Sequence, residues 1–445
     1  MENYIVAIDL GTTKIVALIG EKTDYGRYRI LASCELKSAG IVRGEVENLA
    51  DVTELVKQSV DELRKESGLE FSEVYVGIAG QHIRCLCESV RELRRDARSL
   101  ITQDEIDALR EKMYSIRMEP GEEILHVIPQ NYNVDDRMDI KKPVGMLGKE
   151  LTGNYHIIMG RTGAIDTIKQ CLSNGKVNIK LNRLILEPLA SAAAVLTDEE
   201  KELGVALVDI GGGTTDMVVY YDNTVRHSAV IPFGGNIVTR DIRDGCRISM
   251  QTAESLKIKY GSCLGYLSSD NVYFSVGNKS DDDNKEISSK VLSRIIDARM
   301  GEILKAVKFE LELSGFADKL NAGIVFTGGG SMLANFKQFA EMQTGLESRI
   351  GKPVYLSSDS GIYFAQPFYS TAIGLIIKGA EYEENKQKLE PITVPEIVHE
   401  NTNTQLQPNI EMQTDTKIST KKRKKTGKIK LPDWMDDLFQ ISDTV

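Results

Sequence analysis

The feature that most constrains the fold is a glycine-rich hairpin that occurs twice, about 200 residues apart. The first copy, residues 4–20, is an apolar strand, a Gly-Thr-Thr turn and a second strand, with Asp9 ending the first strand. The second copy, residues 204–220, has Asp209 in the same place. Two unrelated turns would not reproduce the aspartate and both threonines. The repeat therefore predicts two lobes of related α/β architecture, each opening on the same turn.

Both turns suit the phosphates of a nucleotide. Glycines let consecutive backbone N–H groups approach phosphate oxygens, and two opposed tips would clamp the β- and γ-phosphates. Threonine hydroxyls add donors, a lysine adds positive charge, and carboxylates at the strand ends suit magnesium or its waters. We therefore expect ATP and Mg²⁺ as cofactors. The expected contacts are Gly11, Thr12, Thr13, Lys14, Gly211, Gly212, Gly213, Thr214 and Thr215, with Asp9 and Asp209 at the metal.

A third glycine cluster follows an apolar strand and precedes helical sequence. It consists of Gly328, Gly329, Gly330 and Ser331. Its backbone N–H groups, at the start of a helix, are suited to the α-phosphate and ribose. The alternative is a tight strand-to-helix turn without a ligand.

The segment between the two hairpins alternates strands with a helix. Thr102 to Glu105 form a capping box, which starts a helix expected to run to about Arg117. Strands are expected over 74–79, 83–90, 124–133 and 154–159, and a helix over 162–174. After the second hairpin we expect helices over 252–260 and 287–313, a strand over 323–330, and an ordered body that closes near Gly379.

Composition excludes several classes of protein. The 445 residues are 41% hydrophobic, enough for two to four compact units. The 65 acidic residues outnumber the 55 basic ones, which argues against nucleic acid as a partner of the body. The six cysteines are scattered and lack zinc-ligand spacing, so we expect reduced thiols. Without a signal-like N-terminus or a run of about 18 apolar residues, we expect no export and no membrane crossing.

The C-terminal segment changes character twice. Residues 381–420 contain three prolines and many polar residues, the composition of a flexible linker. Residues 421–430 then carry seven basic residues, among them Lys421, Lys422, Arg423, Lys424 and Lys425. Beyond them, Trp434, Met435, Leu438 and Phe439 recur at helical spacing and form one apolar face.

This terminal helix is too short to be stable in water by itself, so it needs an apolar surface on which to fold. Basic charge beside an amphipathic helix is typical of a reversible anchor on an anionic membrane. The alternatives are a protein-binding peptide and a helix that docks on the body of the protein.

Five motifs in order match the superfamily of actin, hexokinase and DnaK-type chaperones. They are residues 9–14, 187–194, 209–216, 327–331 and 370–375. Within it the chain resembles the FtsA family of bacterial cell-division proteins, and the match runs from about residue 4 to residue 380. Three details select that family: the insertion between Ala79 and Gly160, the segment 232–242, and a linker followed by a terminal amphipathic helix.

The resemblance implies a two-lobed actin-like ATPase fold with an FtsA-type inserted subdomain. Lobe one then has its inner subdomain in residues 1–80 and 160–188 and the inserted subdomain in 81–159. Lobe two has its inner subdomain in 189–236 and 325–380 and its outer subdomain in 237–324. The linker and the terminal basic run with its helix, 381–420 and 421–445, complete the chain.

The resemblance also implies partners and a location. FtsA proteins tether the tubulin-like protein FtsZ, in the ring at the division site, to the cytoplasmic face of the bacterial membrane, where they are peripheral. The expected partners are the FtsZ C-terminal peptide, other divisome proteins and neighbouring copies through the inserted subdomain, and an anionic membrane. Arg299 and Glu302 match the FtsZ site, although Ala298 replaces the usual proline. Glu254 and Lys257 match ribose and adenine contacts; the alternative is an ordinary helical i, i+3 pair.

Hydrolysis needs a carboxylate that orients water toward the γ-phosphate. Glu187 is the first candidate and Asp216 the second, and the alternative is that Glu187 caps a helix. We expect at most a weak Mg-dependent ATPase whose main role is structural. Two other functions share the fold: a pilus-assembly protein, and a carbohydrate kinase, whose nearest catalytic candidates would be Asp135 and Asp136 in the insertion.

Overall fold

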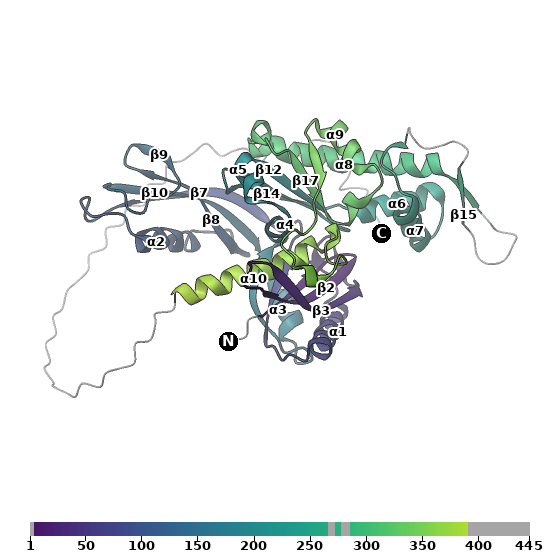
Figure 1. The fold of residues 1–445 in the computed structure, drawn as a ribbon, viewed down its shortest axis with the longest axis horizontal. Coiled ribbons are helices and arrows are strands. Elements are labelled where there is room, and N and C mark those ends of the chain that lie inside the picture. Colours follow the sequence, from purple (N-terminus) through teal and green to yellow (C-terminus); the bar gives the residue numbers. More distant parts are fainter. Residues whose placement is uncertain (1–3, 266–271, 277–284, 390–445) are drawn as a thin grey trace. The chain divides into compact units, whose positions relative to one another are not determined.

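The computed structural model describes residues 4–265, 272–276 and 285–389 (Figure 1). The linker beyond Leu389, the basic run and the terminal helix predicted from the sequence lie outside the described residues.

Lobe one is built on a five-stranded sheet with helices on both faces. Its strands, in spatial order, are β11 (Lys180–Leu186), β6 (Glu73–Ile78), β1 (Tyr4–Leu10), β2 (Lys14–Lys22) and β3 (Tyr28–Lys37). Successive side chains of β1 point alternately into two hydrophobic cores. Val6 and Ile8 belong to a cluster with helices α1 (Leu49–Ser67) and α3 (Thr162–Ser173). Ile5 and Ala7 face the cluster of α4 (Glu187–Val195) and α10 (Ser370–Leu389), which explains why the strand is apolar throughout.

Lobe two repeats this topology. Its strands run β14 (Thr224–Ile231), β13 (Thr215–Tyr221), β12 (Val205–Ile210), β17 (Ile324–Thr327) and β18 (Ser348–Ile350). In both lobes the glycine-rich hairpin is antiparallel, a third strand extends it, and two parallel strands follow on its other side. The two related lobes predicted from the repeat are confirmed.

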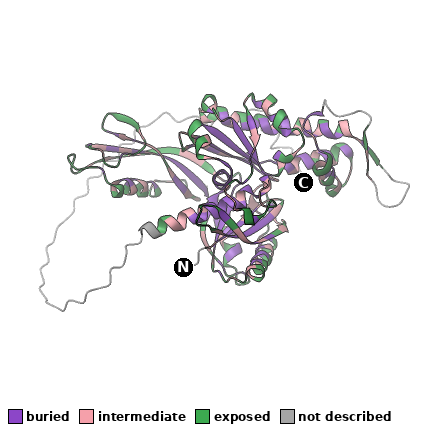
Figure 2. Ribbon diagram, in the orientation of Figure 1, coloured by how far each residue is buried: buried purple, intermediate pink, exposed green. Residues whose placement is uncertain are grey.

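Helices α4 and α10 pack closely against each other in one core that includes residues of both sheets. A Cβ atom added to Gly374 of α10 would lie 1.8 Å from the carbonyl oxygen of Ala190 in α4, so only glycine fits there. Figure 2 shows buried residues concentrated in the two sheets and in α4. This crossing brings the segments around Glu187 and Ser370 to the ends of the two glycine hairpins.

The inserted subdomain has a sheet of its own. Four antiparallel strands lie in the order β7 (Arg84–Leu93), β10 (Glu150–Arg161), β8 (Glu122–Val134) and β9 (Arg137–Ile140). Helix α2 (Gln103–Tyr114) begins with the predicted capping box and packs through Ile106, Leu109 and Met113 on a separate core. It ends three residues before the predicted Arg117.

The outer part of lobe two is mainly helical. Its elements are α6 (Gly235–Cys246), α7 (Met250–Tyr260), β15 (Tyr273–Val276), β16 (Lys285–Ser288) and α8 (Ser289–Ser314). The remaining α-helices and strands of the described residues are α5 (Asp198–Leu203), α9 (Phe336–Thr344), β4 (Ile41–Val42) and β5 (Glu45–Val46). The predicted helices over 252–260 and 287–313 correspond to α7 and α8.

The predicted start of the linker at residue 381 is wrong, because α10 continues to Leu389. Tertiary contacts hold this end of the helix. The hydroxyl of Tyr75 donates to Glu383 at 2.6 Å, and Lys22 pairs with Glu384 at 2.5 Å. Among the described residues, no helix is long and apolar enough to cross a membrane.

Candidate nucleotide-binding site

The two glycine tips, 200 residues apart in sequence, face each other in the structure. A Cβ atom added to Gly212 would lie 1.9 Å from the hydroxyl oxygen of Thr13, and one added to Gly213 would lie 2.3 Å from that of Thr12. The Thr13 hydroxyl also donates to the side-chain oxygen of Asn236 at 3.4 Å. The tips are therefore in van der Waals contact, and a phosphate group between them has to part them.

Backbone contacts hold each tip in shape. A side chain at Gly11 would clash with the Lys14 carbonyl, since its Cβ would lie 2.6 Å from that oxygen. In the second tip, Gly211 N–H donates to the Thr214 carbonyl at 2.9 Å. The carbonyl of Gly211 in turn accepts from Gly235 at the start of α6 at 2.8 Å. The turns are thus preorganised by their own backbone.

The threonines of the second tip do not have free hydroxyl protons. Thr214 donates to the carboxylate of Asp216 at 2.8 Å, and Thr215, fully buried, donates to the Phe233 carbonyl at 2.9 Å. Each hydroxyl has a single proton to donate. In this structure both threonines therefore support lobe two, which differs from the phosphate donors that the sequence predicted.

The predicted metal residue Asp209 lies where several motifs meet. Its Oδ2 accepts hydrogen bonds from Ser191 of α4 at 2.7 Å and from Thr371 of α10 at 3.1 Å. Gly328, in the third glycine cluster, passes so close that a Cβ there would lie 2.2 Å from Asp209 Oδ1. The structure thus brings segments from four motifs to one carboxylate.

Four carboxylates share this region: Asp9, Glu187, Asp209 and Asp216. Burial raises the pKa of Asp9 to about 7, with Asp209 adding to the shift. Burial also raises the pKa of Glu187 and of Asp216 well above the ordinary range, and neighbouring aspartates raise both further. Asp216 Oδ1 is buried without a hydrogen-bond partner. Mutually repelling, poorly solvated carboxylates are the arrangement that a cation relieves.

This donor set fits magnesium bound through few protein ligands. Among the described residues, no three carboxylate, imidazole or thiol side chains lie close enough to enclose an ion by themselves. Magnesium usually keeps several waters and binds through one or two carboxylates together with substrate phosphates. Asp9 and Asp209, at the ends of β1 and β12, are the residues that would hold it.

Lys14 is held by a carboxylate and two aromatic rings. Its ammonium group pairs with Glu35 at 3.1 Å and lies 4.1 Å from the ring centre of Phe368 and 4.3 Å from that of Tyr369. The Tyr369 hydroxyl donates to the same Glu35 at 2.7 Å. Lys14 therefore joins strands β2 and β3 to the lobe-two segment before α10, and a phosphate has to compete with Glu35 for its ammonium group.

The third glycine cluster packs on the end of β12. A Cβ on Gly330 would lie 2.3 Å from the side chain of Ile210, and the buried Ser331 donates to the Gly328 carbonyl at 2.8 Å. Gly329 alone has open space around its Cβ position. A short 3₁₀ turn over 329–332 follows the strand, so the cluster combines the tight turn with one open backbone position.

Glu254 and Lys257 form the i, i+3 pair, with Nζ and Oε2 2.8 Å apart. Lys257 also donates to the Gly235 carbonyl at 3.0 Å and to Thr239 at 2.7 Å. The pair thus connects α7 to the first turn of α6, directly behind the second tip. Both hypotheses for Glu254 and Lys257, an ordinary helical pair and a contact to the nucleotide, are compatible with this position.

Arg299 and Glu302 lie on α8 within a network. Arg299 contacts both carboxylate oxygens of Asp241, at 2.5 and 3.2 Å, and contacts Glu302 at 2.6 Å. Only 12% of its side chain is exposed. Arg299 therefore holds α6 against α8 in this structure, and a partner carboxylate has to compete with two internal ones.

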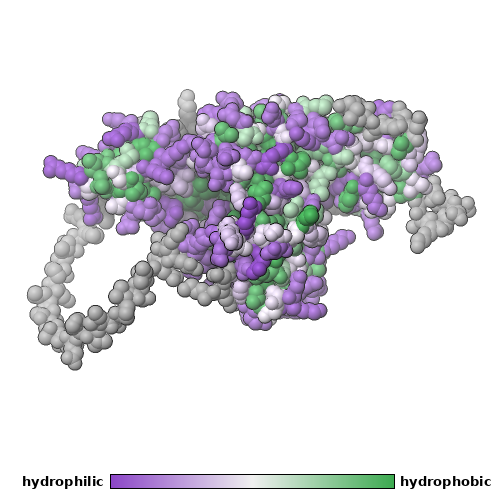
Figure 3. Space-filling view, in the orientation of Figure 1, coloured by the Kyte–Doolittle hydropathy of each residue, from purple (hydrophilic) through white to green (hydrophobic). Residues whose placement is uncertain are grey.

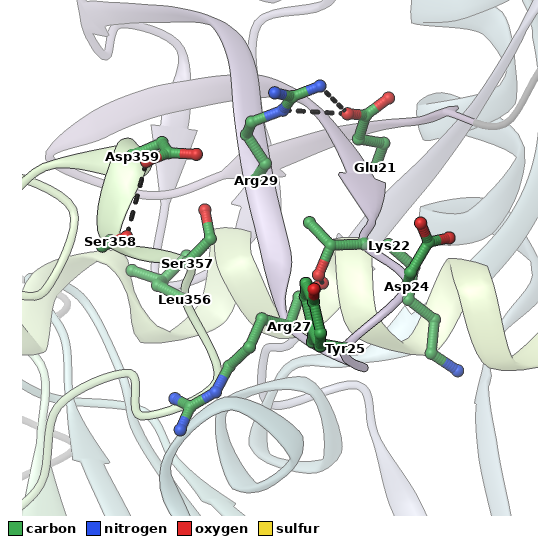
Figure 4. Close-up of a pocket in the computed structure, with 11 residues that line it drawn as sticks. Glu21, Lys22, Asp24, Tyr25, Arg27, Arg29, Leu356, Ser357, Ser358 and Asp359 are labelled. Carbon is green, nitrogen blue, oxygen red and sulfur yellow. Dashed lines mark hydrogen bonds and ion pairs between the residues drawn. The ribbon is translucent and has the colours of Figure 1, made fainter.

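A cavity of about 860 Å³ lies elsewhere, between the turn after β2 and the loop 356–359 (Figure 4). Most of the residues that line it have polar or charged side chains, and Arg29 pairs with Glu21 within it. Because Lys14 and Lys22 are the opposite ends of β2, this cavity is separated from the glycine tips by the length of that strand. None of the predicted nucleotide contacts lines it.

Sequence reasoning missed several residues of the site. Ser191 and Thr371 lie inside matched motifs, so the motifs themselves carried the signal. Glu35 and Tyr369, which hold Lys14, belong to no motif. The predicted membrane residues Lys421, Lys422, Arg423, Lys424, Lys425, Trp434, Met435, Leu438 and Phe439 lie outside the described residues.

Comparisons with known proteins agree on one family. The family description "Cell division protein FtsA" matches residues 206–374, and "SHS2 domain inserted in FTSA" matches residues 80–159. Cell division protein FtsA of Neisseria meningitidis serogroup B is 37% identical over 391 residues, covering 86% of this chain and 92% of that protein. The protein of the same name from Escherichia coli K12 is 31% identical over 388 residues, 86% and 91% of the two chains.

The chain belongs to the FtsA family of cell-division proteins. A solved structure described as the PilM-PilN type IV pilus biogenesis complex covers 84% of this chain and 98% of its own, with a TM-score of 0.59 and 14% identity. That likeness establishes the fold alone. The prediction of an actin-like cell-division adaptor with an FtsA-type insertion is confirmed at the level of the family, and the pilus and kinase alternatives are not favoured.

Proposed function

We propose that this FtsA-family chain binds MgATP between its two glycine tips and, in that form, links FtsZ to the cytoplasmic face of the membrane. The observation that carries the proposal is the meeting of both tips with four carboxylates of raised pKa. Buried anionic groups without compensating cations are costly. A magnesium ion together with the backbone donors of the tips would stabilise them.

In this proposal the backbone N–H groups of 11–13 and 211–213 contact the phosphates. Thr12 and Thr13 add hydroxyl donors, because their side chains lie at the contact between the tips. Magnesium neutralises phosphate charge when bound, and Asp9 and Asp209 orient it. Lys14 exchanges Glu35 for a phosphate. Glu254 and Lys257 lie beyond the second tip, where a ribose and an adenine would extend.

Glu187 is the residue that we assign to water orientation during hydrolysis. It is the first residue of α4, and a Cβ on the neighbouring Gly77 would lie 3.1 Å from its Cγ, so the chain packs tightly around it. Its raised pKa favours a proton on the carboxyl until a cation arrives. Asp216 is the second candidate. The activity is at most a slow ATPase, subordinate to the adaptor role.

The inserted subdomain is the proposed contact surface for other divisome proteins and for neighbouring copies. It exposes a set of large apolar side chains, among which Met138 is 77% exposed. Green atoms are visible in Figure 3 over the region of β8 to β10. The set consists of Leu93, Leu100, Tyr114, Met138, Val144 and Leu147. Exposed apolar side chains that lie together are typical of protein-binding surfaces.

FtsZ is proposed to bind lobe two near α6 and α8. The Arg299 network would position this surface rather than present a free guanidinium. The membrane contact is assigned to the residues after 420, whose basic run and apolar helical face form two separable signals. The chain would thus bind at the division site as a peripheral protein.

Gly212→Val tests the nucleotide site. A branched side chain would fill the space between the tips, so binding of a fluorescent ATP analogue should weaken at least tenfold, about 1.4 kcal/mol. Gly175→Val is the matched control, because a Cβ at Gly175 meets nothing within 4 Å. Unchanged affinity in a Gly212→Val protein that retains the wild-type melting temperature would refute this placement.

A further inference from the structure

A two-residue hairpin outside the five motifs contacts the first glycine tip. Strands β4 and β5 pair through Ile41 with Val46 and Val42 with Glu45, so Arg43 and Gly44 form the turn. The N–H group of Gly44 donates to the hydroxyl oxygen of Thr12 at 3.2 Å. Thr12 in turn touches Gly213 of the second tip. The hairpin is therefore a third element at the junction of the two tips.

The residue at the first position of this turn is unusual. Arg43 has a φ of 49° and Gly44 a φ of 78°, so both lie in the left-handed region that a tight hairpin turn requires. Glycine or asparagine adopts this conformation readily, whereas an arginine there is strained. Strain of this kind persists only where the surrounding structure fixes the residue, and it clusters at ligand-binding and active sites.

The guanidinium of Arg43 differs from two other cations beside the tips. Lys14, in the first hairpin, pairs with Glu35, and Lys257, behind the second tip, pairs with Glu254. Arg43 is half-buried, and none of the hydrogen bonds and ion pairs found in the described ranges involves its guanidinium. The carbonyl carbon of Arg43 is bonded directly to the nitrogen that contacts Thr12. From a turn whose backbone contacts Thr12, an arginine side chain is long enough to reach the junction of the tips.

The hairpin is held in place from behind by the root of the inserted subdomain. A Cβ on Gly44 would lie 3.1 Å from the backbone of Ala79 and Gly80. Glu45 contacts the buried His82 with 3.1 Å between Oε1 and Nδ1. This packing fixes the turn relative to the tip, so the position of Arg43 is preorganised.

We infer that Arg43 binds the terminal phosphate of the nucleotide, making the β4–β5 hairpin a third phosphate-binding element beside the two glycine tips. The inference rests on the proposed binding of ATP. A planar guanidinium forms two parallel hydrogen bonds with phosphate oxygens, which a point charge does not. Because the contact is to the terminal phosphate, Arg43 distinguishes ATP from ADP.

The test is the affinity of the full chain for ATP and ADP, measured by calorimetry in the presence of Mg²⁺ for four proteins. Arg43→Asn removes the guanidinium and keeps a residue that suits the left-handed turn, so the fold is preserved. Arg43→Lys keeps a charge. Arg247→Asn is the matched control, because Arg247 also has a φ of 49° but caps the far end of α6.

Arg43→Asn should weaken ATP binding at least tenfold and ADP binding less than threefold. The ATP affinity of Arg43→Lys should lie between those of Arg43→Asn and wild type. Arg247→Asn should bind both nucleotides as tightly as wild type. An ATP-to-ADP preference in Arg43→Asn equal to that of wild type overturns the inference, and so does an equal loss for both nucleotides. If the wild-type chain itself binds neither nucleotide, the proposed function fails together with the inference.

Discussion

The carboxylate cluster predicts that Asp9→Asn stabilises the metal-free protein. Its pKa is raised from 3.8 to about 7, so the folded state holds a proton that the unfolded state releases between these values. Stability is therefore lost as pH rises from 3.8 to 7. Each pKa unit corresponds to 1.36 kcal/mol, so a shift of roughly three units lowers the free energy of unfolding by about 4 kcal/mol at pH 8. With an unfolding entropy of about 2.1 cal/mol/K per residue, this free energy corresponds to a shift in melting temperature of roughly 5 °C for residues 4–389.

The assay is thermal unfolding at pH 6, 7 and 8, in EDTA and in MgATP. In EDTA at pH 8, Asp9→Asn should melt up to about 5 °C above wild type, and the difference should shrink toward pH 6. In MgATP the wild type should gain stability, and the variant should gain much less because a metal ligand is lost. Asp136→Asn, in an exposed turn, is the control and should show neither effect. An Asp9→Asn protein that melts below wild type in EDTA at pH 8 would show that the Asp9 carboxylate does not destabilise the metal-free fold.

Three further predictions concern other parts of the body. Glu187→Gln should lower single-turnover ATP hydrolysis at least tenfold while changing ATP affinity less than threefold; a wild-type rate removes Glu187 from the mechanism. His126 accepts the N–H of Leu186 at 3.0 Å, and burial lowers its pKa to about 3, so stability falls as pH drops below 6.5. Relative to wild type, His126→Gln should regain about 2 kcal/mol of unfolding free energy in urea at pH 5 and little at pH 7. A difference between the two proteins that stays the same at both pH values would contradict this. Arg299→Glu should cost a few kcal/mol and weaken binding of the FtsZ C-terminal peptide, unlike the exposed Lys305→Glu on the same helix; intact binding in a pull-down would exclude this site.

Local patterns predicted the secondary structure and the repeat. The capping box at Thr102 and the apolar strands that end near Asp9 and Asp209 depend only on residues that are neighbours in the sequence. The same applies to the motifs, whose order predicted that two glycine tips oppose each other. These features could be predicted because the physical cause lies within a few residues of each effect.

The rest depends on contacts between distant segments. The partners of Asp209 depend on how α4 crosses α10 at Gly374, and the cage of Lys14 needs Tyr369, which is more than 300 residues from Glu35. The polar sequence after Gly379 resembles a linker by composition. Its first residues are helical because Tyr75 and Lys22 bind acidic side chains of α10. The hydrogen bond of the Thr215 hydroxyl could not be predicted for the same reason, since its acceptor Phe233 lies on a separate segment.

The most direct test of the adaptor is flotation of FtsZ with anionic vesicles in MgATP. With the wild-type chain present, FtsZ should float with the vesicles, and it should stay behind when the chain is omitted or when Trp434 and Phe439 are both replaced by Glu. Gly212→Val should reduce the floated FtsZ, and Gly175→Val should not. Flotation of FtsZ by the Trp434→Glu and Phe439→Glu double variant at the wild-type level would contradict the account.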